Sequence, residues 1–280
     1  MANEMVLGID IGGTNIRGGL VDQNNLSSIV SCRVNAMGSV EDVLQQLFSL
    51  TDELITITIT AIGIGIPGLV DTERGIVFDV VNIPSWKEVP LQKRMEDRYK
   101  IPVFINNDAN CFALGEFYFG KGVGYNSMVG LTVGTGLGSG LILNKKLYVG
   151  KNCGAGEFGM IDYLDKYVEY YASGQYFTNV YQTDGEVVFK SAGEGNPNAL
   201  RMYEEMGGHL GNAIKIILYS LDVELIILGG SVRSASPYFS KAMWQQIKTL
   251  AFQKSANSLR IEISELENSG ILGAASLYRT

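Results

Sequence analysis

The stretch that decides the fold is VLGIDIGGTNIRGGLVD, residues 6–22, in which glycines stand between two short apolar runs. A dinucleotide-binding loop requires glycines that lead from a strand directly into a helix, but here they lead into a second strand-like run. A P-loop requires the pattern GxxxxGK followed by Ser or Thr, which the chain lacks. The remaining interpretation is a strand–turn–strand clip whose bare backbone amides point at an anion.

A second copy of this pattern lies in MVGLTVGTGLGSGLIL, residues 128–143, where Gly134 aligns with Gly12. Either turn alone could be an ordinary hairpin, because Gly-Gly and Gly-Thr turns are common. The repetition indicates an internal duplication, and hence two similar α/β halves with one clip each.

The residues of the two clips suit the phosphates of a nucleotide. In the first clip, Thr14 and Asn15 add donors to the amides of Gly12 and Gly13, and Asp10 is placed to hold a hydrated magnesium ion. The second clip consists of Gly134, Thr135 and Gly136.

The hydrophobic periodicity alternates between strand and helix, which is typical of an α/β protein. Strands are predicted at residues 5–11, 17–22, 55–67, 101–105, 223–230 and 260–264. Helices are predicted at residues 40–54, 89–99 and 109–119, from Pro197 to 221, from Pro237 onward, and at 270–278. We expect the last helix to return to the first domain.

The composition is that of an acidic globular chain, with 280 residues, 46% of them hydrophobic, and a net charge of −7. This charge argues against nucleic acid as a partner, because phosphate backbones attract basic surfaces. No apolar run approaches the roughly 20 residues of a membrane span. The start of the chain, MANEMVLGID, lacks a basic leader segment, so we expect no membrane association and a cytoplasmic protein.

The pattern of the cysteines and of the single histidine predicts side chains that pack in the core. It does not indicate a metal site or a catalytic proton relay. Cys32, Cys111 and Cys153 are far apart in the sequence, which favours buried thiols over a disulfide framework or a zinc knuckle. His209 lies in a helical run, and one histidine alone does not build a multi-histidine metal site.

The motif INNDAN, residues 105–110, ends a predicted strand and begins a predicted helix. In one interpretation Asn107 or Asp108 is a helix N-cap that satisfies backbone amides. In the other, the helix dipole keeps the carboxylate of Asp108 ionised, so that it takes the proton of an attacking hydroxyl during phosphoryl transfer.

Seven motifs together resemble the ROK family (repressor, open reading frame, kinase), almost from end to end. They are GIDIGGTNIRGGLVD, GIGIPGLVD, VVNIPSW, NNDANCFALGE, GTGLGSGLILNKKLYVGKNCGAGEFG, EYYASG and IILGGSV. The resemblance implies an actin-like ATPase (ribonuclease H-like) α/β fold, in which two similar domains flank a cleft. It implies an N-terminal domain of residues 1–107 plus 268–280 and a C-terminal domain of residues 108–267.

The resemblance also implies roles for residues that match the family. Asp10, Gly12, Gly13, Thr14 and Asn15 would form the first ATP phosphate clip, and Gly134, Thr135 and Gly136 the second. Gly229 and Gly230 would lie under the adenosine. Asp108 would be the base, and Asn82, Asn107, Asp108, Glu157 and Glu169 would bind the sugar. Without the family, Glu157 could equally be solvated, Glu169 could be the polar face of a helix, and Asn82 with Trp86 could be a turn with packing.

The chain departs from the family after GAGEFG. Met160 stands where the family usually has a histidine, and no cysteine cluster follows, so we expect no structural zinc. Packing among Tyr163, Tyr167, Tyr170 and Tyr171 would replace the ordering effect of the metal.

The resulting functional prediction is ATP- and Mg²⁺-dependent phosphorylation of a hexose hydroxyl, the 6-OH of glucose or a similar aldohexose, by a homodimer. An N-acetylated hexosamine, N-acetylmannosamine or N-acetylglucosamine, is the alternative substrate. A sugar-responsive repressor, a catalytically silent sugar or nucleotide sensor and another actin-fold ATPase are the rival functions. Because the first clip begins by residue 8, we expect no DNA-binding module of the kind that a repressor needs. Asp108 argues against a silent sensor. The polar candidates for the sugar site argue against another actin-fold ATPase.

Overall fold

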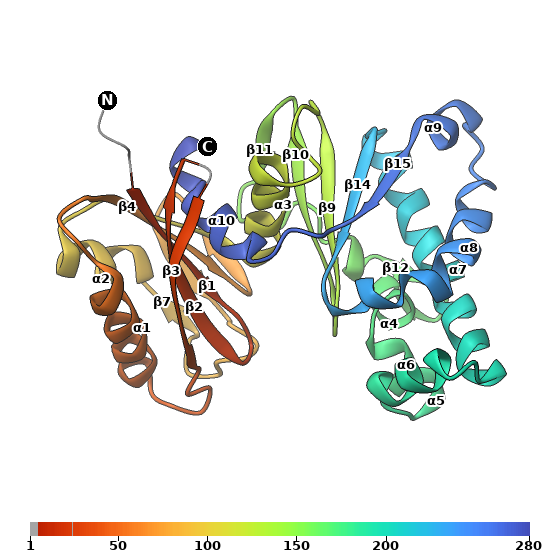
Figure 1. Cartoon of the computed structure of the whole chain (residues 1–280), viewed down its shortest axis with the longest axis horizontal. Coiled ribbons are helices and arrows are strands. Elements are labelled where there is room, and N and C mark those ends of the chain that lie inside the picture. The colour runs from red at the N-terminus through yellow and green to blue at the C-terminus, as the bar shows by residue number, and fades with distance from the viewer. Residues whose placement is uncertain (1–4, 24) are drawn as a thin grey trace. The chain divides into compact units, whose positions relative to one another are not determined.

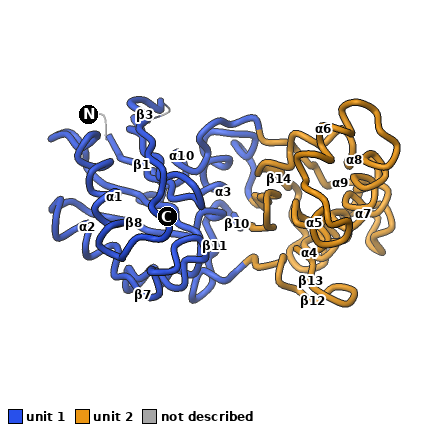
Figure 2. Tube along the Cα trace, turned by 90° about the horizontal axis from the view of Figure 1, so that it is seen from below, with its two compact units in different colours: residues 1–126, 140–155, 265–280 blue, residues 127–139, 156–264 orange. Residues whose placement is uncertain are grey.

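The computed structural model describes residues 5–23 and 25–280, and these form two compact units (Figure 2). Unit 1 comprises residues 1–126, 140–155 and 265–280, and unit 2 comprises residues 127–139 and 156–264. The start of the chain, on which our expectation of no leader rests, falls partly at residues 1–4, outside the described residues. The domain boundaries that the family resemblance implies stay a prediction.

The first clip belongs to a five-stranded sheet of unit 1 with the strand order β3-β2-β1-β4-β8. Figure 1 labels β1 to β4 of this sheet. Its first three strands are antiparallel, and β1, β4 and β8 run parallel. The strands are β1 Met5–Ile11, β2 Asn15–Asp22, β3 Asn25–Arg33, β4 Ile59–Ile66 and β8 Val103–Asn107.

A second five-stranded sheet has the corresponding order, β11-β10-β9-β14-β15. It contains β9 Met128–Val133, β10 Leu137–Leu143, β11 Lys146–Tyr148, β14 Leu225–Gly229 and β15 Arg260–Ile263. The two orders agree strand for strand, as a duplicated unit requires, so the topology confirms the two similar α/β halves. Two small sheets were not predicted: β5 Leu69–Asp71, β6 Ile76–Phe78 and β7 Glu88–Val89 form one, and β12 Asp162–Tyr163 and β13 Lys166–Tyr167 the other.

Helix α1, Val40–Leu54, has the bounds that the sequence predicts. It begins where the side chains of Ser39 and Asp42 form a capping box, and Leu44 and Leu47 bury its apolar face. The strand that follows begins later than predicted, at Ile59 instead of residue 55. The alternating isoleucines and threonines imitate a strand, but Ile55 caps α1 and Ile57 is fully exposed.

The other helices of unit 1 are α2 Leu91–Tyr99, α3 Asp108–Phe119 and α10 Ser269–Ala275. The last of these returns to unit 1, as predicted. It packs so closely that a Cβ on Gly63 would lie 1.8 Å from the carbonyl oxygen of Ala274, and one on Gly273 would lie 1.6 Å from that of Cys111. Glycine is therefore required where β4 and α3 meet this helix.

In the sequence, four helices of unit 2 precede β14 and two lie between β14 and β15. They are α4 Val168–Ala172, α5 Gln175–Tyr181, α6 Gly185–Gly193, α7 Pro197–Leu221, α8 Ser236–Ile247 and α9 Gln253–Ser258. The longest, α7, starts at Pro197 after the N-cap Asn196, as the sequence predicts. Within residues 5–23 and 25–280, no helix combines the length and the apolar character that crossing a bilayer requires.

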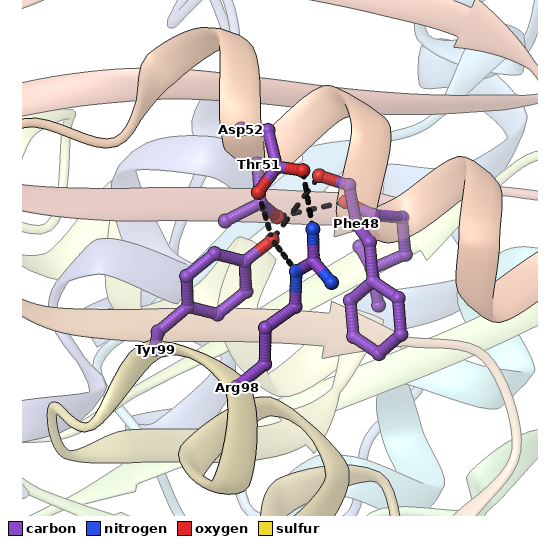
Figure 3. Close-up of polar contacts among 6 residues, drawn as sticks. Phe48, Thr51, Asp52, Arg98 and Tyr99 are labelled. Atoms are coloured by element: carbon purple, nitrogen blue, oxygen red, sulfur yellow. Dashed lines mark hydrogen bonds and ion pairs between the residues drawn. The ribbon is translucent and has the colours of Figure 1, made fainter.

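A polar cluster joins α1 to α2 in unit 1 (Figure 3). The Arg98 guanidinium donates to Asp52 at 2.6 Å, and its carbon lies 4.8 Å from the centre of the Phe48 ring. The hydroxyl of Tyr99 donates to Asp52 at 2.8 Å and to the Phe48 carbonyl at 3.1 Å. Burial and the neighbouring Asp52 raise the pKa of Tyr99 to about 12, so it stays a donor at neutral pH.

Replacing Tyr99 by phenylalanine removes these hydrogen bonds and keeps the ring. We expect Tyr99→Phe to lower the free energy of unfolding by about 1 kcal/mol, because the half-buried Tyr99 hydroxyl is the donor that the Asp52 carboxylate and the Phe48 carbonyl share. Urea unfolding followed by circular dichroism measures the change. Tyr148→Phe, at a tyrosine with 53% exposure, is the matched control and should leave stability unchanged; equal effects of the two variants would contradict the assignment.

Candidate active site

The first glycine turn, residues 12–14, connects β1 to β2 in unit 1. The N–H of Gly12 donates to the carbonyl of Asn15 at 2.9 Å, and the carbonyl of Thr14 accepts from Val34 N–H at 2.9 Å. The N–H groups of Gly13 and Thr14 have no acceptor among residues 5–23 and 25–280. Two neighbouring donors without acceptors are what an anion-binding turn requires.

The second glycine turn, residues 134–136, has the same plan in unit 2. The N–H of Gly134 donates to Gly136 across the turn at 3.0 Å. The carbonyls of Gly134 and Thr135 accept from Gly174 N–H at 2.7 Å and from the Ser173 hydroxyl at 2.9 Å. Within the described chain, the N–H groups of Thr135 and Gly136 have no acceptor.

Asn82 lies directly against the first turn. A Cβ on Gly13 would be only 2.7 Å from the Nδ2 atom of Asn82, whose residue is exposed. Trp86, four residues later, is fully buried in the core of unit 1. The packing interpretation therefore holds for Trp86, whereas Asn82 is available to a ligand beside the turn.

The strand–helix junction at INNDAN separates the two interpretations of that motif. Asn107 is the N-cap of α3: its Oδ1 accepts from Ala109 N–H at 2.8 Å, and its Nδ2 donates to the Gly68 carbonyl at 3.1 Å. Asp108 is the first residue of the helix and accepts from the same N–H at 2.9 Å. Asn107 thus does the capping, and Asp108 supplies the carboxylate.

Burial raises the pKa of Asp108, although the Ala109 N–H opposes the rise. We expected the helix N-terminus to favour the charged form; desolvation outweighs it, so the net shift is opposite to that expectation. Burial, and then the nearby Asp108, also raise the pKa of Asp10 to about 6, partly offset by Arg17. Unit 1 therefore holds two desolvated carboxyl groups that repel each other.

A buried asparagine that the sequence analysis missed holds this junction. The Oδ1 of Asn106 accepts from the N–H of Asn107 at 2.8 Å, from Nδ2 of Asn110 at 2.9 Å and from the Cys153 thiol at 3.4 Å. The repeat of asparagine at 106 and 110, four residues apart across the start of α3, is the signal that could have revealed it. Cys111 and Cys153 are buried as expected, but Cys32 is only half-buried.

The two glutamates predicted to bind sugar lie in unit 2. Glu157 is exposed, just before a short 3₁₀ helix at Phe158–Met160. Glu169, on α4, is half-buried: its Oε2 accepts from Leu137 N–H at 2.7 Å, and its Oε1 accepts from Gln175 Nε2 at 3.3 Å. Glu169 is therefore not a solvated polar face of a helix.

Unit 2 also contains a cavity of about 490 Å³ that begins at the second glycine turn. Gly229 is the last residue of β14, and Gly230 follows it with a φ of 81°. The next residue, Ser231, lines the cavity. Sequence reasoning missed the aromatic part of this lining, which comes from separate helices. The lining includes Gly134, Thr135, Gln175, Phe177, Thr178 and Tyr203.

The segment after Met160 packs through aromatic rings, as predicted. Tyr163 contacts Tyr171, and Tyr167 and Tyr171 each contact Tyr170, at ring-centre distances between 4.9 and 6.0 Å. His209 joins this cluster 5.0 Å from Tyr171, and burial lowers its pKa. Among the described residues, no group of three His, Cys, Asp or Glu side chains could hold a metal ion; the absence of zinc stays a prediction.

Comparisons with known proteins agree with this geometry. A model of the ROK family matches residues 6–280. An N-acetyl-D-glucosamine kinase of Yersinia pseudotuberculosis is 33% identical over 98% of this chain and 99% of its own length. A glucokinase of Thermotoga maritima is 27% identical over 98% of this chain and 97% of its own.

Solved structures show the same fold. A ROK family glucokinase from Streptomyces griseus, in complex with glucose and AMPPNP, superposes with a TM-score of 0.82, 26% identity and 98% coverage of both chains. A putative sugar kinase from Cytophaga hutchinsonii gives a TM-score of 0.84 with 28% identity, covering 99% of this chain and 100% of that one. The chain has the actin-like ATPase fold of these neighbours. Because the family model spans nearly every residue and both glycine turns are in place, the chain belongs to the ROK family.

Proposed function

We propose that this protein is an ATP-dependent sugar kinase that transfers a phosphoryl group to a hexose hydroxyl. The observation that carries the proposal is the pair of glycine turns, each with two N–H groups lacking acceptors among the described residues, together with the desolvated carboxyl of Asp108. Full-length similarity to sugar kinases supports it.

In this proposal the glycine turns bind the phosphates of ATP. The first uses Gly12, Gly13, Thr14 and Asn15, and the second uses Gly134, Thr135 and Gly136. A charge-assisted hydrogen bond to phosphate contributes about 1.5 to 3 kcal/mol, so several amides hold the phosphate chain without a lysine. The adenosine occupies the cavity of unit 2, past Gly229 and Gly230, where the rings of Phe177 and Tyr203 offer apolar surface.

Asp10 fits a hydrated magnesium ion. Magnesium prefers one or two carboxylates together with water and substrate phosphates, and Asp10, near the end of β1 beside the first glycine turn, supplies a carboxylate there. A bound cation would neutralise the developing charge on the phosphates, and it would offset the burial and the repulsion by Asp108 that raise the pKa of Asp10.

Asp108 is the proposed general base. Its raised pKa brings it nearer to the working pH, which makes it a better acceptor for the proton of the attacking hydroxyl. Asn82, Glu157 and Glu169 hydrogen-bond the other sugar hydroxyls. Asn107 keeps one amide hydrogen beyond its bond to Gly68 and serves the same purpose.

The sugar is glucose or a similar aldohexose, phosphorylated at the 6-OH, in our first proposal. A second candidate is an N-acetylated hexosamine, because the N-acetyl-D-glucosamine kinase relative is 33% identical to this chain and the Thermotoga maritima glucokinase 27%. A homodimer and a cytoplasmic location stay predictions.

Removing the base tests the mechanism. We expect the wild type to release ADP only when a sugar is present, in a panel of glucose, N-acetylglucosamine and N-acetylmannosamine. Asp108→Asn should lower kcat by about 10²- to 10⁴-fold, because an amide does not accept the proton. A coupled ADP assay measures the rates. The control is Asp97→Asn, at an exposed aspartate on α2, and it should retain activity. ADP release without sugar, or full activity of Asp108→Asn, would contradict the mechanism.

We expect the carboxylate of Asp10 to be needed for activity and to lower the stability of the folded state. Its folded-state pKa of about 6 exceeds the ordinary 3.8, so the folded state binds the proton more tightly and the free energy of unfolding falls as pH rises through this window. At pH 7 this corresponds to about 3 kcal/mol. We expect Asp10→Asn to be inactive yet more stable than the wild type at pH 7 by up to that amount.

Urea unfolding in EDTA at pH 7 and pH 3.5 checks this expectation. The gain should nearly vanish at pH 3.5, where the aspartate is mostly protonated in both states. Asp97→Asn serves again as the control, since its carboxylate is exposed and paired with Lys93. A destabilised Asp10→Asn, with the same difference at both pH values, would contradict the argument.

A further inference from the structure

The carboxylate of Glu169 holds the end of the second glycine turn. Its Oε2 accepts from Leu137 N–H at 2.7 Å, the first amide after Gly136. A Cβ on Gly136 would lie 2.5 Å from the same oxygen, so the carboxylate packs directly on the turn. A residue expected only to contact sugar is therefore also part of the framework of the phosphate clip.

The segment that follows Glu169 holds the rest of the turn. Ser173, which is fully buried, and Gly174 bind the carbonyls of Thr135 and Gly134. With its carbonyls engaged, the turn keeps its amides for a ligand. Residues 169–175 thus act as a bracket around residues 134–137.

Gln175 connects this bracket to the cavity. Its backbone N–H donates to the Ser173 hydroxyl at 3.2 Å, and its side-chain Nε2 donates to Glu169 Oε1 at 3.3 Å. Gln175 also lines the cavity, beside Thr135. One side chain therefore touches both the proposed nucleotide cavity and the carboxylate that is proposed to bind sugar.

We infer that Gln175 is a positioning residue that couples nucleotide binding to sugar binding through Glu169. The inference rests on the proposed function. A carboxylate has about four acceptor positions, so Glu169 can accept sugar hydroxyls while keeping Leu137 and Gln175. A nucleotide that orders Gln175 and the turn also orders Glu169, and the sugar then binds without that ordering cost. The coupling is positive and reciprocal.

The test is the effect of a nucleotide on sugar affinity. Calorimetry gives the Kd of glucose and of N-acetylglucosamine with and without Mg²⁺-AMPPNP. In the wild type we expect the nucleotide to tighten sugar binding by about fivefold or more. In Gln175→Ala this ratio should fall toward one, while the Kd of the sugar alone changes by less than about twofold, because Leu137 still holds Glu169.

A second variant adds a pH signature that a merely structural role would not produce. Gln175→Glu places two carboxyl groups at hydrogen-bonding distance, and these repel each other when both are charged. We expect coupling to be absent at pH 8 and partly restored at pH 6, where a shared proton re-forms the donor. Thr178→Ala is the matched control: it lines the cavity one turn later on α5 but bonds to Thr183 instead of Glu169, so its ratio should stay at the wild-type value.

A wild-type ratio near one, or an unchanged ratio in Gln175→Ala, would overturn the coupling. Equal losses in Gln175→Ala and Thr178→Ala would overturn the role of Glu169 in it. Sugar binding by a wild type that forms no ADP would contradict the kinase proposal alone, because the ratio still decides the coupling. A wild type that binds neither sugar would overturn both.

Discussion

The candidate site depends on hydrogen bonds that hold the two glycine turns in place. In each unit, residues outside the turn bind its carbonyl groups or the amide beside it. In unit 2, Ser173 and Gly174 bind the carbonyls of the turn, and Glu169 binds the amide that follows it. In unit 1, Val34 binds the carbonyl of Thr14. Peptide groups held in this way keep their remaining amides directed at a ligand, since a turn free to rotate would satisfy them internally.

The desolvated carboxyl groups of unit 1 lower the stability of the folded protein at neutral pH. Asp10 and Asp108 both have raised pKa values, chiefly from burial, and the charge of Asp108 adds to the rise at Asp10. Stability alone would favour an amide at either position. Their retention as acids agrees with a site that receives a cation and a proton, where stability and activity oppose each other.

The aromatic cluster of unit 2 shows how packing orders the segment after Met160, in which this chain lacks the histidine and the cysteine cluster that are usual in the family. Tyr163, Tyr171 and His209 meet at ring distances of 5.0 to 5.9 Å, and the Tyr163 hydroxyl contacts Nδ1 of His209 at 3.2 Å. Aromatic contacts of this kind contribute about 0.5 to 1.5 kcal/mol each beyond area burial. They fix α4, and so the position of Glu169, by short-range packing.

The sequence by itself determined the duplicated α/β halves, the bounds of α1, the two glycine turns and the place of Asp108 at the start of α3. These follow from local signals: periodicity, a capping box and a strand after the glycines. Only the tertiary structure decided the late start of β4 and the direction of the Asp108 pKa shift. It also decided the hydrogen bonds that Asn106 accepts and those that Leu137 and Gln175 donate to Glu169. Each of these depends on burial or on partners distant along the chain, and periodicity contains no information about either.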